Sequence, residues 1–262
     1  LTYSKNKIVF RDEPAMQYAY QKSEGTRYGE FYGYIAEGYF QSEEEIKKSP
    51  RQMRELAPGD IKYKDLNDDG VIDANDQCYL GKSWFPSWSY GMGFNINYHN
   101  FDLALFFQGV SDVSIMANGG SIDTGNGDWG ASGVGIVPFT GMGLNPSNVI
   151  TKALDRWTAD NPRADAWYPR MTANATTNDN NYVNSTHWLK DGSYLRLKQA
   201  SLGYTLENKK LMDKGIEYLY FYLSGQNLLT FSKFKLWDPE LGSNGAKYPL
   251  SRMVTLGMRV SF

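Results

Sequence analysis

Residues 88–98, WSYGMGFNINY, alternate apolar with small or polar side chains in a strict period of two. The apolar residues all share one parity: Trp88, Tyr90, Met92, Phe94, Ile96 and Tyr98. Because successive side chains of a β-strand point to opposite faces of its sheet, this segment predicts a strand with one wholly apolar face. Such a face is either buried against a core or turned toward lipid in a β-barrel.

A second apolar run follows directly after His99 and Asn100. Its apolar residues again share one parity: Phe101, Leu103, Leu105 and Phe107. The two runs predict a β-hairpin with a two-residue turn. Each limb has about 9–11 residues, the length that crosses a bilayer when a strand is tilted.

Similar alternation elsewhere predicts seven strands in all. They span residues 1–10, 28–40, 88–98, 101–110, 194–206, 217–225 and 252–262. Within 194–206 the apolar parity changes, so we expect a β-bulge near Lys198 to Ala200. In the last strand Arg259 lies opposite the apolar residues, which suits a water-filled interior better than lipid.

The connections between the predicted strands alternate in length. Those at residues 99–100 and 207–216 are short, whereas 41–87, 111–193 and 226–251 are long, with one helix expected near 147–159. In outer-membrane barrels the short turns are periplasmic and the long loops extracellular, which places the C-terminus in the periplasm. Single-chain bacterial barrels have an even number of strands from about 8 upward, so we expect a fragment whose missing part precedes Leu1.

The composition excludes two classes of protein. The 27 Lys and Arg residues are balanced by 29 Asp and Glu, which leaves no basic excess for binding nucleic acid. No stretch approaches the ~20 apolar residues that a transmembrane helix needs. By contrast, 15% aromatic residues and 26 glycines suit strands and turns. Cys78 is the one cysteine in the sequence, which excludes an internal disulfide framework.

Residues 65–76 match the spacing of a twelve-residue calcium loop. The ligands would be the side chains of Asp65, Asn67, Asp69 and Asp73, the carbonyl of Val71, and Asp76 at the last position. Asp76 departs from the pattern because it stands where Glu is usual. The loop predicts a structural Ca²⁺ site in an extracellular segment, with a metal-free turn held by Asx hydrogen bonds as the alternative.

Contacts with a solute or a partner are expected among the aromatic residues of the long connections. These residues are Trp129, Trp157, Trp167, Tyr168, Trp188 and Trp237, whose rings could stack on sugars. The alternative is packing within the loops or against a partner protein, because Trp and Tyr anchor interfaces in general. Arg196 and Lys198 could face the barrel interior and contact the solute.

Catalysis has no supporting arrangement of residues in the sequence. His99 lies in a tight turn and His187 in a polar loop, and neither accompanies a nucleophile motif or a second ligand at a diagnostic spacing. Ser42 and Glu45 predict a capped, solvated helix rather than a binding patch. We therefore predict that the protein is not an enzyme.

Several blocks of sequence carry a family resemblance when taken together and in order. They are residues 32–34 (YGY), 38–46 (GYFQSEEEI), 58–73 (PGDIKYKDLNDDGVID), 101–103 (FDL), 107–109 (FQG), 156–158 (RWT), 191–198 (DGSYLRLK), 225–230 (GQNLLT), 237–240 (WDPE) and the terminal Phe262. These blocks resemble the C-terminal part of SusC/RagA-type TonB-dependent outer-membrane transporters. The resemblance covers most of the chain from about Phe31 onward.

The resemblance implies an all-β fold: the antiparallel C-terminal strands of a large transmembrane barrel, of about 22 strands in the family, with long extracellular loops and without the plug. It implies import of oligosaccharides or peptides across a Gram-negative outer membrane. The TonB system would act through the missing N-terminal part, and a SusD-like surface lipoprotein would form the lid. Phe262 resembles the terminal signal read by the barrel-assembly machinery.

A second hypothesis from another class is a secreted, β-rich carbohydrate-binding protein with a structural calcium loop. It explains the aromatic residues and the metal motif. It does not explain the alternation of long and short connections, or an apolar face as complete as that of residues 88–98.

Overall fold

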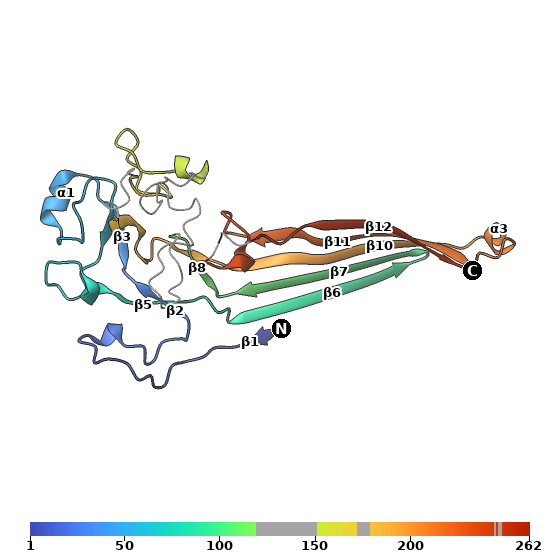
Figure 1. The fold of residues 1–262 in the computed structure, drawn as a ribbon, viewed down its shortest axis with the longest axis horizontal. Coiled ribbons are helices and arrows are strands. Elements are labelled where there is room, and N and C mark those ends of the chain that lie inside the picture. The colour runs from blue at the N-terminus through green and yellow to red at the C-terminus, as the bar shows by residue number, and fades with distance from the viewer. Residues whose placement is uncertain (119–150, 172–178, 244, 246–247) are drawn as a thin grey trace.

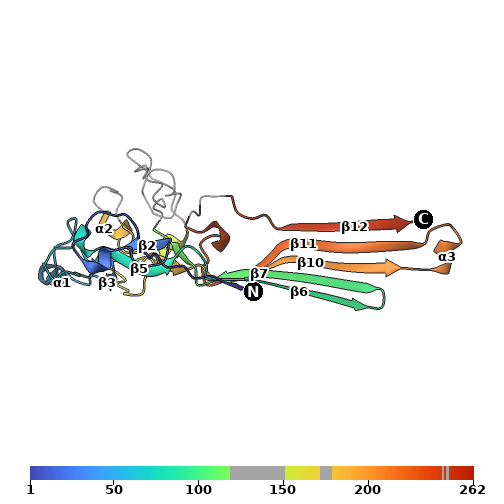
Figure 2. The same ribbon diagram turned by 90° about the horizontal axis from the view of Figure 1, so that it is seen from below.

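The computed structural model of the chain describes residues 1–118, 151–171, 179–243, 245 and 248–262. A long antiparallel sheet forms one end of the molecule, and short strands, helices and loops gather at the other end (Figure 1). A second view shows the same division, with the long strands running away from the loops (Figure 2). We call the described residues of 18–87, 112–193 and 233–245 the loop cluster.

The long sheet has six strands in the order β1-β6-β7-β10-β11-β12. Their bounds are β1 Thr2–Tyr3, β6 Trp88–Tyr98, β7 Phe101–Ser111, β10 Tyr194–Leu206, β11 Tyr218–Ser232 and β12 Met253–Ser261. Every pair of neighbours is antiparallel. β1 and β12 do not pair with each other, so the sheet is open and forms no closed barrel within this chain.

Pairing within the sheet confirms two local predictions. Tyr98 pairs directly with Phe101, which leaves a two-residue turn in which His99 has a φ of 51°. The register of β10 shifts between Leu197 and Gln199 against both neighbouring strands, so Lys198 is the extra residue of a bulge.

The register gives the sheet one apolar and one polar face, because side chains alternate along each strand. The larger residues of the apolar face are Tyr3, Trp88, Tyr90, Met92, Phe94, Ile96, Tyr98, Phe101, Leu103, Leu105, Phe107, Leu195, Leu197, Leu202, Tyr204, Leu206, Leu219, Phe221, Leu223, Leu229, Phe231, Val254, Leu256, Met258 and Val260. Polar residues of the other face include Asn95, Asn97, Asp102, Gln108, Arg196, Gln199, Thr205, Tyr220, Tyr222, Thr230 and Arg259. In the sheet that the structure describes, no charged residue occupies a paired position on the apolar face.

The loop cluster contains three two-stranded sheets and most of the short helices. The strand pairs are β2 Glu30–Gly33 with β5 Cys78–Ser83, β3 Ala36–Tyr39 with β4 Ile61–Tyr63, and β8 Ser114–Met116 with β9 Leu189–Asp191. The α-helices are α1 Glu43–Lys48 and α2 Asp179–Tyr182 in the cluster, and α3 Lys209–Met212 at the far end of the long sheet. The 3-10 helices are η1 Ala19–Gln21, η2 Ala74–Asp76, η3 Thr151–Leu154 and η5 Pro239–Leu241. Among the described residues, no helix is long and apolar enough to cross a membrane.

The predicted strand over residues 28–40 is wrong. This segment forms β2 and β3, which pair inside the loop cluster and not with the long sheet. Its aromatic residues fall on both parities, and Phe31, Tyr34, Tyr39 and Phe40 are all buried. A segment that buries both faces packs into a core and cannot leave one face for lipid.

Other predicted bounds also change. Only Thr2–Tyr3 of the strand expected at 1–10 joins the sheet, and Ile8 instead pairs with Thr26 of the following loop through a backbone hydrogen bond of 2.8 Å. The strand expected at 217–225 extends to Ser232, so the last long connection begins there. Of the helix expected at 147–159, residues 147–150 lie outside the described part, and within the described residues Thr151–Leu154 form a 3-10 turn.

The remaining small predictions concern α1 and Cys78. The Ser42 hydroxyl accepts a hydrogen bond of 3.2 Å from the backbone N–H of Glu45, which confirms the predicted helix cap. Cys78 is a free, buried thiol.

Candidate functional site

The apolar face of the sheet is exposed in this chain although its residues are large. Leu256 is 79% exposed, Ile96 55% and Leu223 47%. An apolar surface of this extent marks an interaction with lipid or protein, because folded monomers rarely expose such a patch to water.

The tyrosine and tryptophan residues of the apolar face lie toward its two ends, whereas Phe94 and Phe107 lie near its middle. At the end with the short connections, Phe101 packs against Tyr204 with 4.7 Å between ring centroids. At the end beside the loop cluster, Tyr3 packs against Trp88 at 4.5 Å. Aliphatic residues such as Leu202 lie between them. Two aromatic girdles around an aliphatic band are typical of membrane-spanning barrels.

The loop cluster has a hydrophobic core of its own. Its buried residues are Phe31, Tyr34, Tyr39, Ile61, Tyr63, Ile72, Met116, Ala153, Trp157, Ala166, Tyr168 and Trp188. These residues come from segments far apart in the sequence, so the loop cluster is a packed unit at one end of the long sheet (Figure 1).

Three of the predicted contact residues belong to this core. Trp157 is 5% exposed, and Tyr168 and Trp188 are 0% exposed. The Trp188 indole N–H donates to the carbonyl of Asn181 at 2.7 Å. Gly59 has a φ of 92°, and a Cβ placed there would lie 2.2 Å from the Trp157 ring. The chain itself covers these three rings, which corresponds to the alternative of packing within the loops.

The other predicted aromatic residues are placed differently. Trp167 is partly buried against the core and packs on Trp188 with 5.4 Å between ring centroids. Trp237 is also partly buried and packs against Phe234. Trp129 lies outside the described residues.

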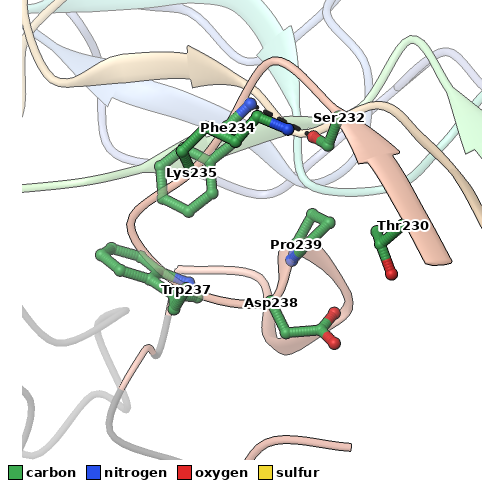
Figure 3. A pocket seen from close by; sticks show the side chains of 7 residues that line it. All are labelled: Thr230, Ser232, Phe234, Lys235, Trp237, Asp238 and Pro239. Atoms are coloured by element: carbon green, nitrogen blue, oxygen red, sulfur yellow. Dashed lines mark hydrogen bonds between the residues drawn. The ribbon is translucent and has the colours of Figure 1, made fainter. Parts of the chain in front are cut away.

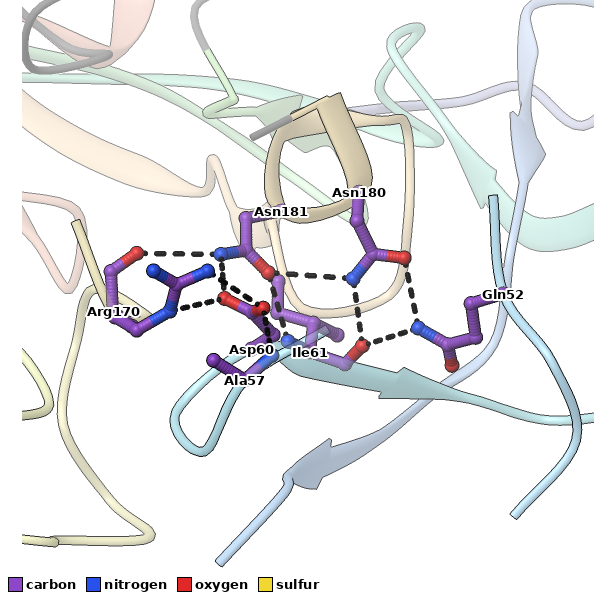
Figure 4. Close-up of polar contacts among 7 residues, drawn as sticks. All are labelled: Gln52, Ala57, Asp60, Ile61, Arg170, Asn180 and Asn181. Carbon is purple, nitrogen blue, oxygen red and sulfur yellow. Dashed lines mark hydrogen bonds and ion pairs between the residues drawn. The ribbon is translucent and has the colours of Figure 1, made fainter. Parts of the chain in front are cut away.

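A buried ion pair ties two of the long connections together (Figure 4). Arg170 donates from Nε to Asp60 Oδ1 at 3.0 Å and from Nη2 to Oδ2 at 2.9 Å. Asp60 is 2% exposed, and it also accepts from Asn181 Nδ2 at 2.7 Å and from the backbone N–H of Ala57 at 2.8 Å. The carboxylate is thus fully hydrogen-bonded, which offsets the cost of its burial.

Two neighbouring amides extend this network. Gln52 donates to the carbonyl of Ile61 at 2.9 Å and accepts from the backbone N–H of Tyr63 at 2.7 Å, as an adjacent strand would. Asn180 donates to the same carbonyl at 3.0 Å. The two amides satisfy the buried edge of β4, and they join residues near 60 to residues near 180 (Figure 4).

Arg196 holds the last long connection to the polar face of the sheet. Its side chain is 1% exposed; its Nη2 forms an ion pair with Asp238 and lies 3.5 Å from a carboxylate oxygen of Glu240. Lys198 reaches the same Glu240 at 3.9 Å. Arg196 thus lies on the polar face, as the expectation of an interior-facing residue requires, and its guanidinium is buried against two carboxylates.

The loop at residues 65–76 is closed by its last residue. Asp76 is 0% exposed, and its two oxygens accept from the backbone N–H groups of Leu66 at 2.7 Å and Asp73 at 2.9 Å. Asp69 accepts from the N–H of Val71 at 2.8 Å, so the predicted Asx hydrogen bonds are present.

Among the predicted calcium ligands, one oxygen atom of Asp65 is suited to binding a cation. Asp65 Oδ2 accepts from the N–H of Gly70 at 2.8 Å, whereas Oδ1 is buried without a hydrogen-bond donor in the described structure. A buried carboxylate oxygen without a donor is the kind of group that a bound cation would satisfy. Within the described residues, however, no three His, Cys, Asp or Glu side chains converge to hold a metal.

His187 is held in the loop cluster in its neutral form. Its Nε2 lies 3.3 Å from the Tyr39 hydroxyl and 3.2 Å from the carbonyl of Trp167. Burial, with a smaller effect from Lys190, lowers the pKa of His187 to about 4. Burial likewise lowers the pKa of Lys190, which donates to the carbonyl of His187 at 2.6 Å. The contacts of His187 are therefore packing contacts within the loop cluster.

Sequence reasoning missed the residues that connect the segments of the loop cluster. Asp60 lies in a quoted block, but no spacing pointed to Arg170 or Asn181 as its partners. Sequence reasoning also missed the contact of η1 with the loop at residues 65–76, which we call the strap at η1. The hydroxyl of Tyr20 donates to the carbonyl of Asn75 at 2.7 Å, and Gln21 donates to the carbonyl of Ala74 at 3.2 Å. These partners are 53 and 55 residues apart, a separation over which local patterns carry no signal.

The chain was compared with family models, curated proteins and solved structures. No protein-family model matches the chain. The chain is 30% identical over 241 residues to TonB-dependent receptor P26 of Formosa agariphila, covering 86% of this chain and 22% of the relative. It is 28% identical over 255 residues to TonB-dependent receptor P3 of the same organism, covering 91% and 22%. The chain spans about a fifth of the length of these relatives.

Solved structures share the fold. The RagAB peptide importer matches in its 'open-open' state with a TM-score of 0.61 and 22% identity, covering 92% of this chain and 23% of that chain. Its 'closed-closed' state matches with a TM-score of 0.60 and 22% identity, covering 92% and 24%.

Proposed function

The chain is a relative of TonB-dependent receptors with the fold of part of the RagAB importer, and on this premise we propose that it forms one wall of a TonB-dependent outer-membrane importer. The two-faced sheet is the observation that carries this proposal. Its apolar face would contact the acyl chains of the bilayer, and its polar face would line the interior of a barrel completed by strands outside this chain. The family resemblance predicted from the sequence blocks is confirmed by these relatives.

We propose that the loop cluster is extracellular and that the C-terminus is periplasmic. The short connections lie at one end of the sheet and the long ones at the other (Figure 1), as in outer-membrane barrels. In a barrel of about 22 strands, these strands would form roughly a quarter of the wall.

A SusD-like surface lipoprotein is the proposed partner on the outside. The packed core and the Asp60–Arg170 ion pair give the loop cluster a fixed surface at the mouth of the barrel, which suits a lid better than separate loops would. The TonB system would act through a part of the protein outside this chain. Oligosaccharides or peptides are the proposed solutes.

A secreted carbohydrate-binding protein is the alternative function, and the apolar face argues against it. In water, that face would expose Leu256, Ile96 and Leu223 without a covering layer. Such a surface would drive aggregation.

A structural Ca²⁺ ion in the loop at residues 65–76 remains a proposal. The buried Oδ1 of Asp65 supports it. The ion would fix an extracellular turn to which the strap at η1 is hydrogen-bonded.

The import function is tested in the organism that carries the full-length protein. Deletion of the gene should remove uptake of a solute that the wild type takes up, and loss of TonB should have the same effect. When the deletion strain is complemented with a gene lacking the codon for Phe262, the outer membrane should contain less assembled barrel than after complementation with the intact gene. Recovery of the protein in a soluble, detergent-free fraction, with uptake unchanged by the deletion, would contradict the proposal.

A further inference from the structure

A groove lies where the polar face of the sheet meets the loop cluster (Figure 3). It is lined by Thr230, Ser232, Phe234, Lys235, Trp237, Asp238 and Pro239. Thr230 and Ser232 belong to the polar face of β11, because they pair with Arg196 and Tyr194 of β10. The groove therefore continues the proposed barrel interior into the loops at its mouth.

Trp237 forms one fixed side of this groove. Its indole N–H donates to the carbonyl of Gly242 at 2.8 Å, and its ring meets Phe234 edge-on at 4.6 Å. The backbone of Gly245 lies so close to the ring that a Cβ there would be 2.5 Å from it. Because three contacts hold the ring and the side chain is still partly exposed, Trp237 offers a preorganised aromatic surface.

The two charged side chains beside this surface differ in whether they already have a partner of opposite charge. Asp238 is engaged, since it pairs with Arg196 and accepts from the backbone N–H of Glu240 at 3.0 Å. Lys235 is exposed and forms no salt bridge within the described chain. The groove thus presents a neutralised carboxylate and a free ammonium group, which favours a ligand that carries negative charge.

We propose that this groove binds an acidic sugar residue of the imported solute. The apolar face of the sugar ring stacks on Trp237, and a carboxylate or sulfate on the ring pairs with Lys235. This inference rests on the proposed import function and adds the chemical class of the solute. Phe234 and Pro239 are buried and leave Trp237 as the large, partly exposed ring among the residues that line the groove. One flat ring and one cation match the apolar face and the single acidic group of a sugar residue.

The test measures binding by calorimetry to the full-length protein in detergent. The probes are oligogalacturonide and a sulfated galactan oligosaccharide, with a neutral gluco-oligosaccharide of equal length and a Glu-rich peptide for comparison. At least one acidic saccharide should bind, and Lys235→Gln should weaken that binding by about tenfold, because a hydrogen bond to a charged group is lost. Lys209→Gln in α3, at the far end of the sheet, should leave it unchanged.

A second substitution tests the aromatic surface. Trp237→Ala should abolish saccharide binding, whereas Trp237→Phe should retain part of it. Failure of both acidic saccharides to bind, or equal binding by wild type and Lys235→Gln, would overturn the inference.

Uptake separates this inference from the import function. If a peptide or a neutral sugar is imported and Lys235→Gln has no effect, the acidic-sugar site is refuted while import stands. If deletion of the gene changes no uptake and the protein is absent from the outer membrane, the import function itself fails, and the site fails with it.

Discussion

Replacing Leu223 by arginine should destabilise the protein far more than the same change at Ser224. Leu223 lies on the apolar face, where it pairs with Leu202 and Leu256, and Ser224 points to the polar face. The two residues are adjacent in one strand, so the pair separates the effect of the face from that of the strand.

The depth of Leu223 sets the size of the effect. It lies five residues beyond Tyr218, the first residue of β11, which is about 17 Å along the strand at ~3.3 Å per residue. With a tilt of about 40°, that is about 13 Å of height, near the middle of an apolar band ~25 Å tall. Arginine on the lipid face at this depth costs about 2–4 kcal/mol, a factor of roughly 30 to 900 in the folding equilibrium.

Equilibrium denaturant unfolding of the full-length protein in liposomes measures this difference. Ser224→Arg should change the free energy of unfolding by no more than about 0.5 kcal/mol, as for a solvated surface position. If Leu223→Arg were equally mild, the apolar face would be in water, and the membrane assignment would be refuted.

Three further predictions concern the loop cluster. Asp238→Asn should leave the buried Arg196 poorly compensated at a cost of about 3 kcal/mol, so hydrogen exchange in residues 233–241 should rise by about 100-fold. Unchanged exchange would show that this ion pair does not hold the loop. Ca²⁺ should raise the melting temperature and EDTA should reverse the change, with the response lost in Asp65→Asn and kept in Asp68→Asn; no response in the wild type would refute the metal site. The pKa of His187 is lowered from 6.5 to about 4, so the free energy of unfolding should be highest above pH 6.5 and fall toward pH 4, by on the order of 3 kcal/mol. His187→Gln should flatten this part of the pH dependence, and a profile equal to that of the wild type would contradict it.

The strands of the long sheet were accessible to sequence reasoning because each obeys a local rule. β6 has the bounds that its alternation gives, and the parity change in β10 marks the bulge at Lys198. Lipid on one face and water on the other impose a period of two on every such strand. That signal is contained within a window of about ten residues.

The loop cluster was not accessible in the same way. Residues 28–40 carry aromatic side chains on both parities, and the structure buries them on both sides of β2 and β3. The sequence around Trp157 and Trp188 did not indicate which residues would pack against their rings. Their burial depends on contacts between segments more than a hundred residues apart, such as that of Asp60 with Arg170.

Part of the candidate site followed from the sequence, and part did not. The blocks containing Arg196 and Asp238 were recognised, but their mutual ion pair was not, since it joins strand β10 to the last long connection, about forty residues away in the sequence. The calcium spacing identified Asp65, whose buried oxygen is consistent with a cation. The closing role of Asp76 could not be inferred from spacing alone.

The most direct test of the central claim is the accessibility of spin labels along β6 in the native membrane. Labels would be placed singly at residues 92 to 96 of the full-length protein, with Cys78 replaced by alanine. Membrane insertion predicts that labels at Met92, Phe94 and Ile96 collide with oxygen dissolved in lipid, and that labels at Gly93 and Asn95 collide with a water-soluble nickel reagent. Uniform access of the nickel reagent to all five positions would contradict the claim that this sheet is a wall of a membrane barrel.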